Sequence, residues 1–310
     1  MYIRNICGSD MDEIISLWKK TLPYLVIDRN IFMKKIFLEV NFSQEGFFVA
    51  VDDDKIVGFV NAVYRKVPIC AGAEIETEVG WISAFVVDKD YLYVGDLLLE
   101  KAEIYLIKNG KSIINTGYYP TYFVQGIDER YTPEYIDIFE KRGYNKNRSI
   151  AMILDLNKYC VPQTLEQKRL RLEEEGVSFI SLSDEYITEL LSLKNDFLKP
   201  SWLYEYQNRV KDMDFERFKL AVKDGKVVGA CVFDDPDSAP ERFGPFGVSE
   251  ACQGKGIGGV LLADTLAEMK KRGLKSAWMQ WASDDKGASI LYERAGFVEK
   301  ESYIEFEKRI

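Results

Sequence analysis

The segment FGVSEACQGKGIGG, residues 246–259, passes from a short apolar stretch into a loop with glycine at four of its last six positions. The chain then continues as VLLADTLAEMKKR (260–272), whose apolar residues recur at helical spacing. This order predicts a strand, a glycine loop and a helix. Glycine accepts positive φ and lets a ligand approach the backbone closely, while a helix N-terminus adds free N–H groups and partial positive charge. The combination favours binding of a pyrophosphate group.

The glycine spacing argues against two common nucleotide-binding patterns. A P-loop requires Gly-Lys followed by Ser or Thr, but here Gly256 follows Lys255. The Rossmann pattern requires an early strand and an acidic residue for the ribose, and neither accompanies these glycines. Residues 253–258 instead fit Q/R-x-x-G-x-G/A. This loop resembles the acetyl-CoA loop of the GNAT superfamily of N-acetyltransferases.

A second GNAT-like signature follows a predicted strand over residues 275–281. The sequence DKGASILYERAGF (285–297) resembles N-x-x-A-x-x-x-Y-x-x-x-G-F, with Asp285 where Asn is usual. The resemblance covers roughly residues 177–310. It implies the following cofactor-binding residues: Val248, Gln253, Gly254, Lys255, Gly256, Ile257, Gly258, Gly259, Asp285 and Ala288.

Length and charge restrict the class of protein. A chain of 310 residues exceeds one ordinary domain, so two are expected. A net charge of −9 without a long basic run disfavours nucleic acid as a partner. No apolar run reaches the length of a membrane span, and the first residues lack the apolar core of a signal peptide. We therefore expect a cytoplasmic protein with no membrane partner.

Histidine is absent from the chain, which excludes Ser-His-Asp catalysis and most zinc mechanisms. The five cysteines are widely spaced and form no C-x-x-C pair, which argues against a disulfide framework and against a metal site. No metal is expected. Proton transfer must then use carboxylates, Tyr, Cys, Lys or water.

The same order of elements occurs twice along the chain, which indicates an internal repeat of about half its length. The first copy is predicted as strand 2–6, helix 9–22 and hairpin 47–60, and the second as strand 177–181, helix 184–193 and hairpin 218–232. We expect an α/β fold of two tandem GNAT-like domains, each a mixed, mostly antiparallel sheet flanked by helices.

The first copy lacks the features that would hold a cofactor. With Gly95 aligned on Gly258, residues 90–94 (DYLYV) replace the glycine loop, and the side chains of Tyr91 and Tyr93 would occupy the space that a pyrophosphate needs. Phe139 stands opposite Tyr292, so the hydroxyl is lost as well. In having one eroded and one intact copy, the chain is similar to tandem acetyltransferases of the mycothiol synthase type.

These comparisons predict the domain boundaries. Residues 1–157 form a degenerate GNAT-like domain, 158–176 a charged helical connector, and 177–310 the catalytic domain. Strand 149–156 should close the first half, as strand 301–307 closes the second.

Acetyl transfer to an amine requires a neutral nucleophile, a polarised carbonyl and a proton for the leaving thiolate. Deprotonating a lysine-like amine at pH 7 costs about 4–5 kcal/mol, so a general base is useful. Glu241 and Asp284 flank the place where GNAT strands separate and are the candidates, each with a solvated loop charge as the alternative interpretation. The resemblance implies Tyr292 as general acid, and the alternative is an aromatic core residue. A pKa near 10 would suit that role.

The predicted function is acetyl-CoA-dependent N-acetylation, with direct attack by a primary amine of a small molecule or peptide in the C-terminal domain. The acceptor stays open among amino sugars, polyamines, antibiotics and peptide N-termini. Three aromatic residues after Pro200 (Trp202, Tyr204 and Tyr206) are interpreted either as an acceptor-side cluster or as packing. The alternative from another class is a non-catalytic acetyl-CoA-binding sensor or scaffold.

Overall fold

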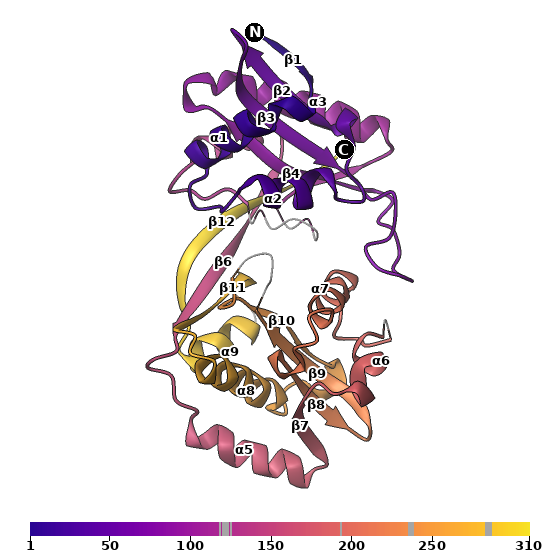
Figure 1. The fold of residues 1–310 in the computed structure, drawn as a ribbon, viewed down its shortest axis with the longest axis vertical. Coiled ribbons are helices and arrows are strands. Elements are labelled where there is room, and N and C mark those ends of the chain that lie inside the picture. The colour runs from indigo at the N-terminus through magenta and orange to yellow at the C-terminus, as the bar shows by residue number, and fades with distance from the viewer. Residues whose placement is uncertain (118, 120–123, 125, 193, 235–238, 283–286) are drawn as a thin grey trace. The chain divides into compact units, whose positions relative to one another are not determined.

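The computed structural model describes residues 1–117, 119, 124, 126–192, 194–234, 239–282 and 287–310. The chain forms two compact units (Figure 1). Unit 1 comprises Met1–Pro68, Glu74–Ser149 and Glu301–Ile310, and unit 2 comprises Ile69–Ala73 and Ile150–Lys300.

Unit 1 is built on a sheet in the order β1-β2-β3-β4-β5-β12, followed by the first residues of β6. Its strands are β1 (Tyr2–Asn5), β2 (Phe47–Asp52), β3 (Lys55–Val63), β4 (Val79–Val87), β5 (Ile113–Thr116) and the end of β12 (Val298–Arg309). Its helices are α1 (Met11–Thr21), α2 (Arg29–Phe32), α3 (Tyr93–Lys108) and α4 (Glu134–Lys141). Neighbouring strands from β1 to β4 are antiparallel, β4 and β5 are parallel, and β5 and β12 are antiparallel. The sheet is therefore mixed and mostly antiparallel, as predicted.

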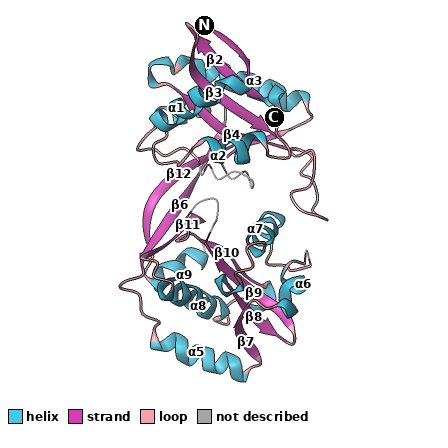
Figure 2. Cartoon of the chain, in the orientation of Figure 1, coloured by secondary structure: helices cyan, strands magenta, loops and turns pink. Residues whose placement is uncertain are grey.

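Helices cover both faces of this sheet (Figure 2). Successive side chains of a strand point to opposite faces, so Phe59 packs with Trp18 of α1, their ring centroids 5.7 Å apart, while Val60 joins the cluster of Leu98 and Leu99 of α3. Strands buried on both faces explain why β3 and β4 are almost continuously apolar.

Unit 2 repeats this order of elements. Its strands are β7 (Val177–Ser181), β8 (Phe218–Lys223), β9 (Lys226–Phe233), β10 (Phe243–Val248), β11 (Ser276–Ala282) and the end of β6 (Asn145–Asp155). Its helices are α5 (Gln163–Glu174), α6 (Ile187–Leu190), α7 (Pro200–Val210), α8 (Ile257–Lys271) and α9 (Gly287–Ala295). Strands β7 to β10 are antiparallel neighbours, a parallel bridge joins Arg242 to Trp278 of β11, and β11 pairs with β6. The internal repeat of the sequence is thus a repeat of topology.

The closing strands of the two halves are exchanged. The sequence predicts that strand 149–156 closes the first half, but residues 150–155 of β6 pair with β11 in unit 2. Residues 307–309 of β12 pair with β5 in unit 1. Both closing strands contain a buried apolar stretch, residues 150–152 in β6 and 303–306 in β12, and such a stretch does not by itself specify which sheet the strand completes. The compact units therefore differ from the predicted ranges 1–157 and 177–310.

The remaining elements follow the sequence closely. The predicted connector is helical over α5, but the helix predicted over 184–193 is reduced to a 3-10 turn (Asp184–Tyr186) and the short α6. Among the helices that the structure describes, none combines the length and the apolarity that a bilayer span requires.

Candidate active site

The loop between β10 and α8 has the backbone conformation that its glycines predict. Gly254 and Gly256 have φ of 73° and 96°, a region that side chains with a Cβ rarely adopt. Gly256 is also the N-cap of α8, a helix of 15 residues. The first-turn N–H groups of α8 and its positive dipole end therefore lie at this loop.

Side chains hold the loop in place. Gln253 Nε2 donates a hydrogen bond to Val248 O at 3.0 Å, and Lys255 Nζ donates to Ala251 O at 2.7 Å. Asp196 Oδ2 accepts from Ser249 Oγ at 2.9 Å and from Glu250 N at 3.1 Å. The carbonyl of Val248 has a second lone pair for another donor. Asp196 lies 53 residues from Ser249 in the chain, and no local pattern in the sequence points to it.

Two further glycines of the loop serve packing. A Cβ on Gly258 would lie 3.3 Å from the Phe246 ring, and a Cβ on Gly259 would lie 3.1 Å from Leu165. The first turn of α8 can therefore approach β10 and α5 closely. The side chain of Ile257 is 1% exposed and belongs to an apolar cluster with Cys252. The side chain of Ile257 therefore serves packing, so the cofactor contact predicted for this residue would have to come from its backbone.

Tyr292 of α9 is 5% exposed and packs edge-on against Phe243 and tilted against Phe246, at ring-centroid distances of 5.7 and 6.3 Å. Burial raises the pKa of its phenol well above the ordinary value of 10, with a smaller contribution from nearby Cys231. The phenol is therefore protonated at neutral pH but is a weaker acid than the sequence alone suggests. Within the described part of the chain, no hydrogen bond engages its hydroxyl.

The predicted base Glu241 lies immediately before the bridge between β10 and β11. It is half-buried, and its carbonyl accepts a hydrogen bond from Trp278 N at 3.0 Å. Past this point β10 continues through Val248, and no further pair joins it to β11 among the described residues. Asp284 and Asp285 lie outside the described residues. The backbone of Ala288 lies in the first turn of α9.

In unit 1 the side chain of Tyr135 closes the edge of β4, the strand that corresponds to β10. Tyr135 is the counterpart of Ala288 when Phe139 is aligned with Tyr292. The Tyr135 hydroxyl accepts a hydrogen bond from Val87 N at 2.7 Å and donates one to Val87 O at 2.8 Å. Val87 ends β4 as Val248 ends β10. Both backbone groups of Val87 are therefore already satisfied by this side chain.

A carboxylate caps the 3-10 turn (Lys89–Tyr91) that precedes α3. Asp88 Oδ1 accepts from Asp90 N at 3.3 Å, and Asp88 Oδ2 pairs with Lys20 Nζ at 2.6 Å. Tyr91 is half-buried and Tyr93 is 61% exposed, so Tyr93 points largely into solvent rather than filling the loop.

The aromatic residues after Pro200 divide between the two interpretations. Tyr206 is fully buried, and its hydroxyl donates to Pro245 O at 2.9 Å, so it is a packing residue. Trp202 lies beside β10, 3.1 Å from where a Cβ on Gly247 would be. Trp202 therefore packs against the strand that leads into the glycine loop.

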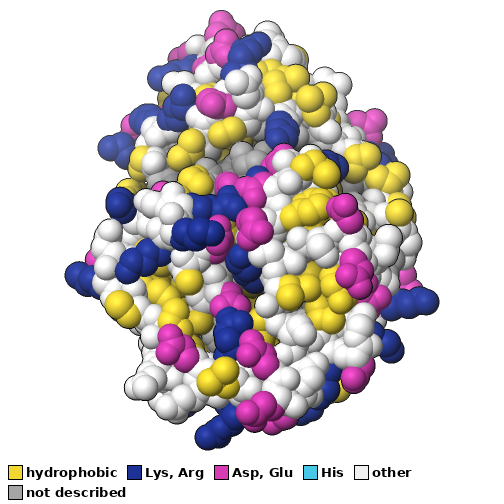
Figure 3. All heavy atoms as spheres, turned by 60° about the horizontal axis from the view of Figure 1, so that its bottom comes forward, with side chains coloured by type: hydrophobic (Ala, Val, Ile, Leu, Met, Phe, Trp, Pro, Cys, Tyr) yellow, Lys and Arg dark blue, Asp and Glu magenta, His cyan; other side chains and the backbone are white. Residues whose placement is uncertain are grey.

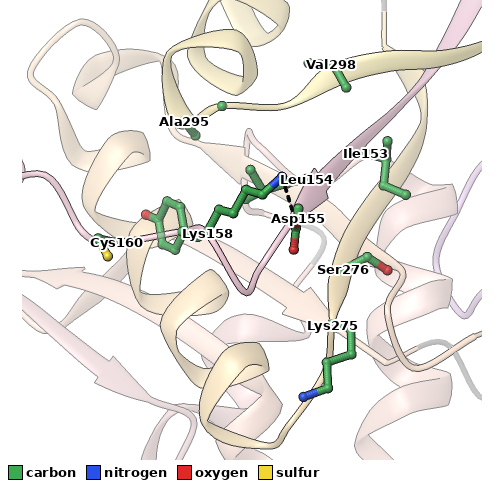
Figure 4. Close-up of a pocket in the computed structure, with 11 residues that line it drawn as sticks. Ile153, Leu154, Asp155, Lys158, Cys160, Lys275, Ser276, Ala295 and Val298 are labelled. Carbon is green, nitrogen blue, oxygen red and sulfur yellow. Dashed lines mark ion pairs between the residues drawn. The ribbon is translucent and has the colours of Figure 1, made fainter.

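A cavity of about 570 Å³ lies elsewhere in unit 2, at the end of β6 and the start of β11 (Figure 4). Ile153, Leu154 and Val298 contribute apolar walls, and Lys158 pairs with Asp155 at 3.4 Å across its mouth. None of the predicted cofactor-binding residues lines it.

No group of three or more Cys, Asp or Glu side chains suited to a metal ion occurs among the residues with described positions. On the face shown in Figure 3, acidic and basic side chains are interspersed and form no broad area of one sign.

Both units have the fold of the GNAT class of acetyltransferases. The family model of the acetyltransferase (GNAT) family matches residues 11–117 and again residues 186–297. The chain therefore belongs to the acetyltransferase (GNAT) family, and it carries the family fold twice.

Solved structures show the same fold at low sequence identity. A glucosamine N-acetyltransferase region of a fungal multi-domain β-N-acetylglucosaminidase is 20% identical with a TM-score of 0.78; the match covers 99% of this chain but only 38% of that protein. An acetyltransferase from Sphaerobacter thermophilus is 18% identical, with a TM-score of 0.71 and 99% and 95% of the two chains covered. A tandem GNAT protein from the clavulanic acid pathway is 14% identical, with a TM-score of 0.62 and coverages of 99% and 98%. Among proteins of curated function, none matches.

Proposed function

We propose that the chain is an acetyl-CoA-dependent N-acetyltransferase whose reaction takes place in unit 2. The observation that carries the proposal is the glycine loop, in which Gly254 and Gly256 hold positive φ at the N-cap of α8. A loop of this form presents N–H groups to a diphosphate without side-chain obstruction. Family membership supports acyl transfer in general, and acetyl-CoA as the donor is part of the proposal.

The structure of unit 1 supports the proposal that each chain has a single cofactor site. The Tyr135 hydroxyl satisfies both backbone groups of Val87, so the strand edge that would receive a cofactor is already occupied by a side chain. The equivalent backbone at Val248 has its carbonyl bonded only through the side chain of Gln253 among the described contacts. We infer that unit 1 has a structural role and that unit 2 binds the cofactor.

Each candidate residue has a distinct task in this proposal. Bound acetyl-CoA supplies the thioester carbonyl that the amine attacks. The backbone of Val248 orients the pantetheine arm, and Tyr292 protonates the departing thiolate. Glu241 or Asp284 removes a proton from the ammonium group of the acceptor, directly or through water, so that the neutral amine attacks.

The test is a thiol-release assay with acetyl-CoA over a panel of amino sugars, polyamines, aminoglycosides and peptides. Turnover with at least one primary amine, lost in Gly256→Val, would support the enzyme. Tight acetyl-CoA binding with no turnover over the whole panel would favour the non-catalytic sensor or scaffold. Comparing Glu241→Gln with Asp284→Asn across pH would identify the base, because loss of a base removes the acidic limb of the kcat/KM profile.

A further inference from the structure

The connector helix α5 packs against the first turns of α8. Leu172 shares a buried cluster with Ile257 and Val260, and Leu165 lies 3.1 Å from the Cβ position of Gly259. Arg169 forms an ion pair with Asp264 of α8. Three separate contacts therefore fix α5 beside the glycine loop.

Lys168 of this helix lies directly over Gly256. A Cβ at Gly256 would be 2.8 Å from Lys168 Cε, 3.1 Å from its Cγ and 3.2 Å from its Cδ. The aliphatic stem thus covers the N-cap of α8, and the ammonium, one bond beyond Cε, is at the same end of the helix.

The ammonium group of Lys168 differs from the other cations near the loop in its partners. Lys255, the cation within the loop, donates to Ala251 O, and Arg169 pairs with Asp264. Lys168 makes no hydrogen bond or ion pair to any residue whose position is described, and its side chain is half-exposed. In a chain of net charge −9, this cation packs on the glycine loop without an ion-pair partner in the part of the chain that the structure describes.

We propose that Lys168 is a phosphate-binding residue that the connector helix contributes to the cofactor site. This inference rests on the proposed function, since the ligand is a CoA-type molecule. Residues 163–174 lie between the two stretches that the family model matches, 11–117 and 186–297. Lys168 therefore lies outside both segments that match the family model. A lysine acts as a point charge toward phosphate, and CoA offers two targets, the diphosphate and the 3′-phosphate.

Calorimetric titration with CoA tests the proposal. Lys168→Met keeps the stem over Gly256 and removes the charge, so the fold should be retained, which thermal unfolding would check. Affinity should fall about 10- to 100-fold, as expected for loss of a hydrogen bond to a charged group. Lys168→Arg keeps the positive charge and should retain most of the wild-type affinity for CoA. The control Lys271→Met removes the same charge at the far end of α8 and should change affinity less than twofold.

A second titration, with 3′-dephospho-CoA as the ligand, identifies which phosphate group of CoA Lys168 binds. If the difference between wild type and Lys168→Met disappears with this ligand, Lys168 binds the 3′-phosphate; if the difference persists, it binds the diphosphate. If the wild type binds CoA and Lys168→Met binds it with the same affinity, the role of Lys168 is wrong but the proposed function stands. Absence of CoA binding by the wild type would instead contradict the proposed function and this inference together.

Discussion

Tyr292 and Phe139 occupy corresponding positions in the two units, and the pair supplies a built-in comparison. Phe139 is 1% exposed and stacks on Phe306 at a centroid distance of 4.9 Å and an interplanar angle of 13°. A phenyl ring is therefore tolerated at this position of the fold, and the hydroxyl of Tyr292 is free to serve a chemical role.

We expect Tyr292→Phe to bind acetyl-CoA normally and to lower kcat by about 10²- to 10⁴-fold, the usual contribution of a positioned general acid. Steady-state and single-turnover kinetics would measure the effect. The control Phe139→Tyr should leave turnover per folded molecule unchanged. If Tyr292→Phe retains more than about half of kcat with chemistry rate-limiting, Tyr292 is a core aromatic.

The burial of Tyr292 also predicts a pH dependence. Because its pKa lies above the ordinary 10, the phenol keeps its proton through neutral and mildly alkaline pH. The kcat ratio of wild type to Tyr292→Phe should therefore be constant from about pH 6 to pH 9. A ratio that declines steadily across this range would mean that the phenol ionises early and would argue against a buried acid.

At the residue scale, the sequence was sufficient to predict the backbone conformation of the glycine loop. It was not sufficient to predict which residues from other segments contact the candidate site. Gly254, Gly256 and Tyr292 belong to short motifs whose spacing reflects local backbone needs. Tyr135 and Lys168 act through contacts with segments distant in sequence, and one chain alone carries no signal of such contacts. Desolvation of Tyr292 likewise depends on packing, so its raised pKa was not foreseeable.

At the element scale, the exchanged strands β6 and β12 link the two halves. Phe306 belongs to the last strand of the chain, yet it completes the core of unit 1 with Phe139 and Tyr144. The sequence located both strands and their apolar residues correctly. Their partners depend on which sheet edge each strand reaches, and this is decided by the tertiary structure.

Phe306→Ala is therefore expected to destabilise unit 1 by about 3–5 kcal/mol, the usual range for a buried Phe-to-Ala change. Hydrogen exchange should show lost protection in β5 (Ile113–Thr116), with protection in β11 retained. The reverse pattern, with β11 exposed and β5 unaffected, would show that each half closes its own sheet.

At the scale of the whole molecule, unit 2 includes residues from outside the predicted catalytic range 177–310. It includes Ile150–Asp155 of β6, helix α5 and the segment Ile69–Ala73, where Cys70 and Ala73 pack against Leu203 of α7. A fragment of residues 177–310 would leave β11 without its partner strand and expose the apolar side of α8 that α5 covers.

We expect that fragment to be poorly soluble or inactive. Its solubility, circular dichroism and thiol release, compared with those of the full chain, measure the prediction. Full activity of residues 177–310 would show that the first half is dispensable and that the strand exchange is not required for the site.

The central claim is one cofactor site per chain, formed by the glycine loop of unit 2. Calorimetric titration of the full chain with acetyl-CoA tests it directly, with Gly256→Val and Tyr93→Gly as matched variants. We predict a stoichiometry near one, loss of binding in Gly256→Val, where φ of 96° and Lys168 leave no room for a side chain, and no gain in Tyr93→Gly. A stoichiometry of two, or full binding by Gly256→Val, would contradict the claim.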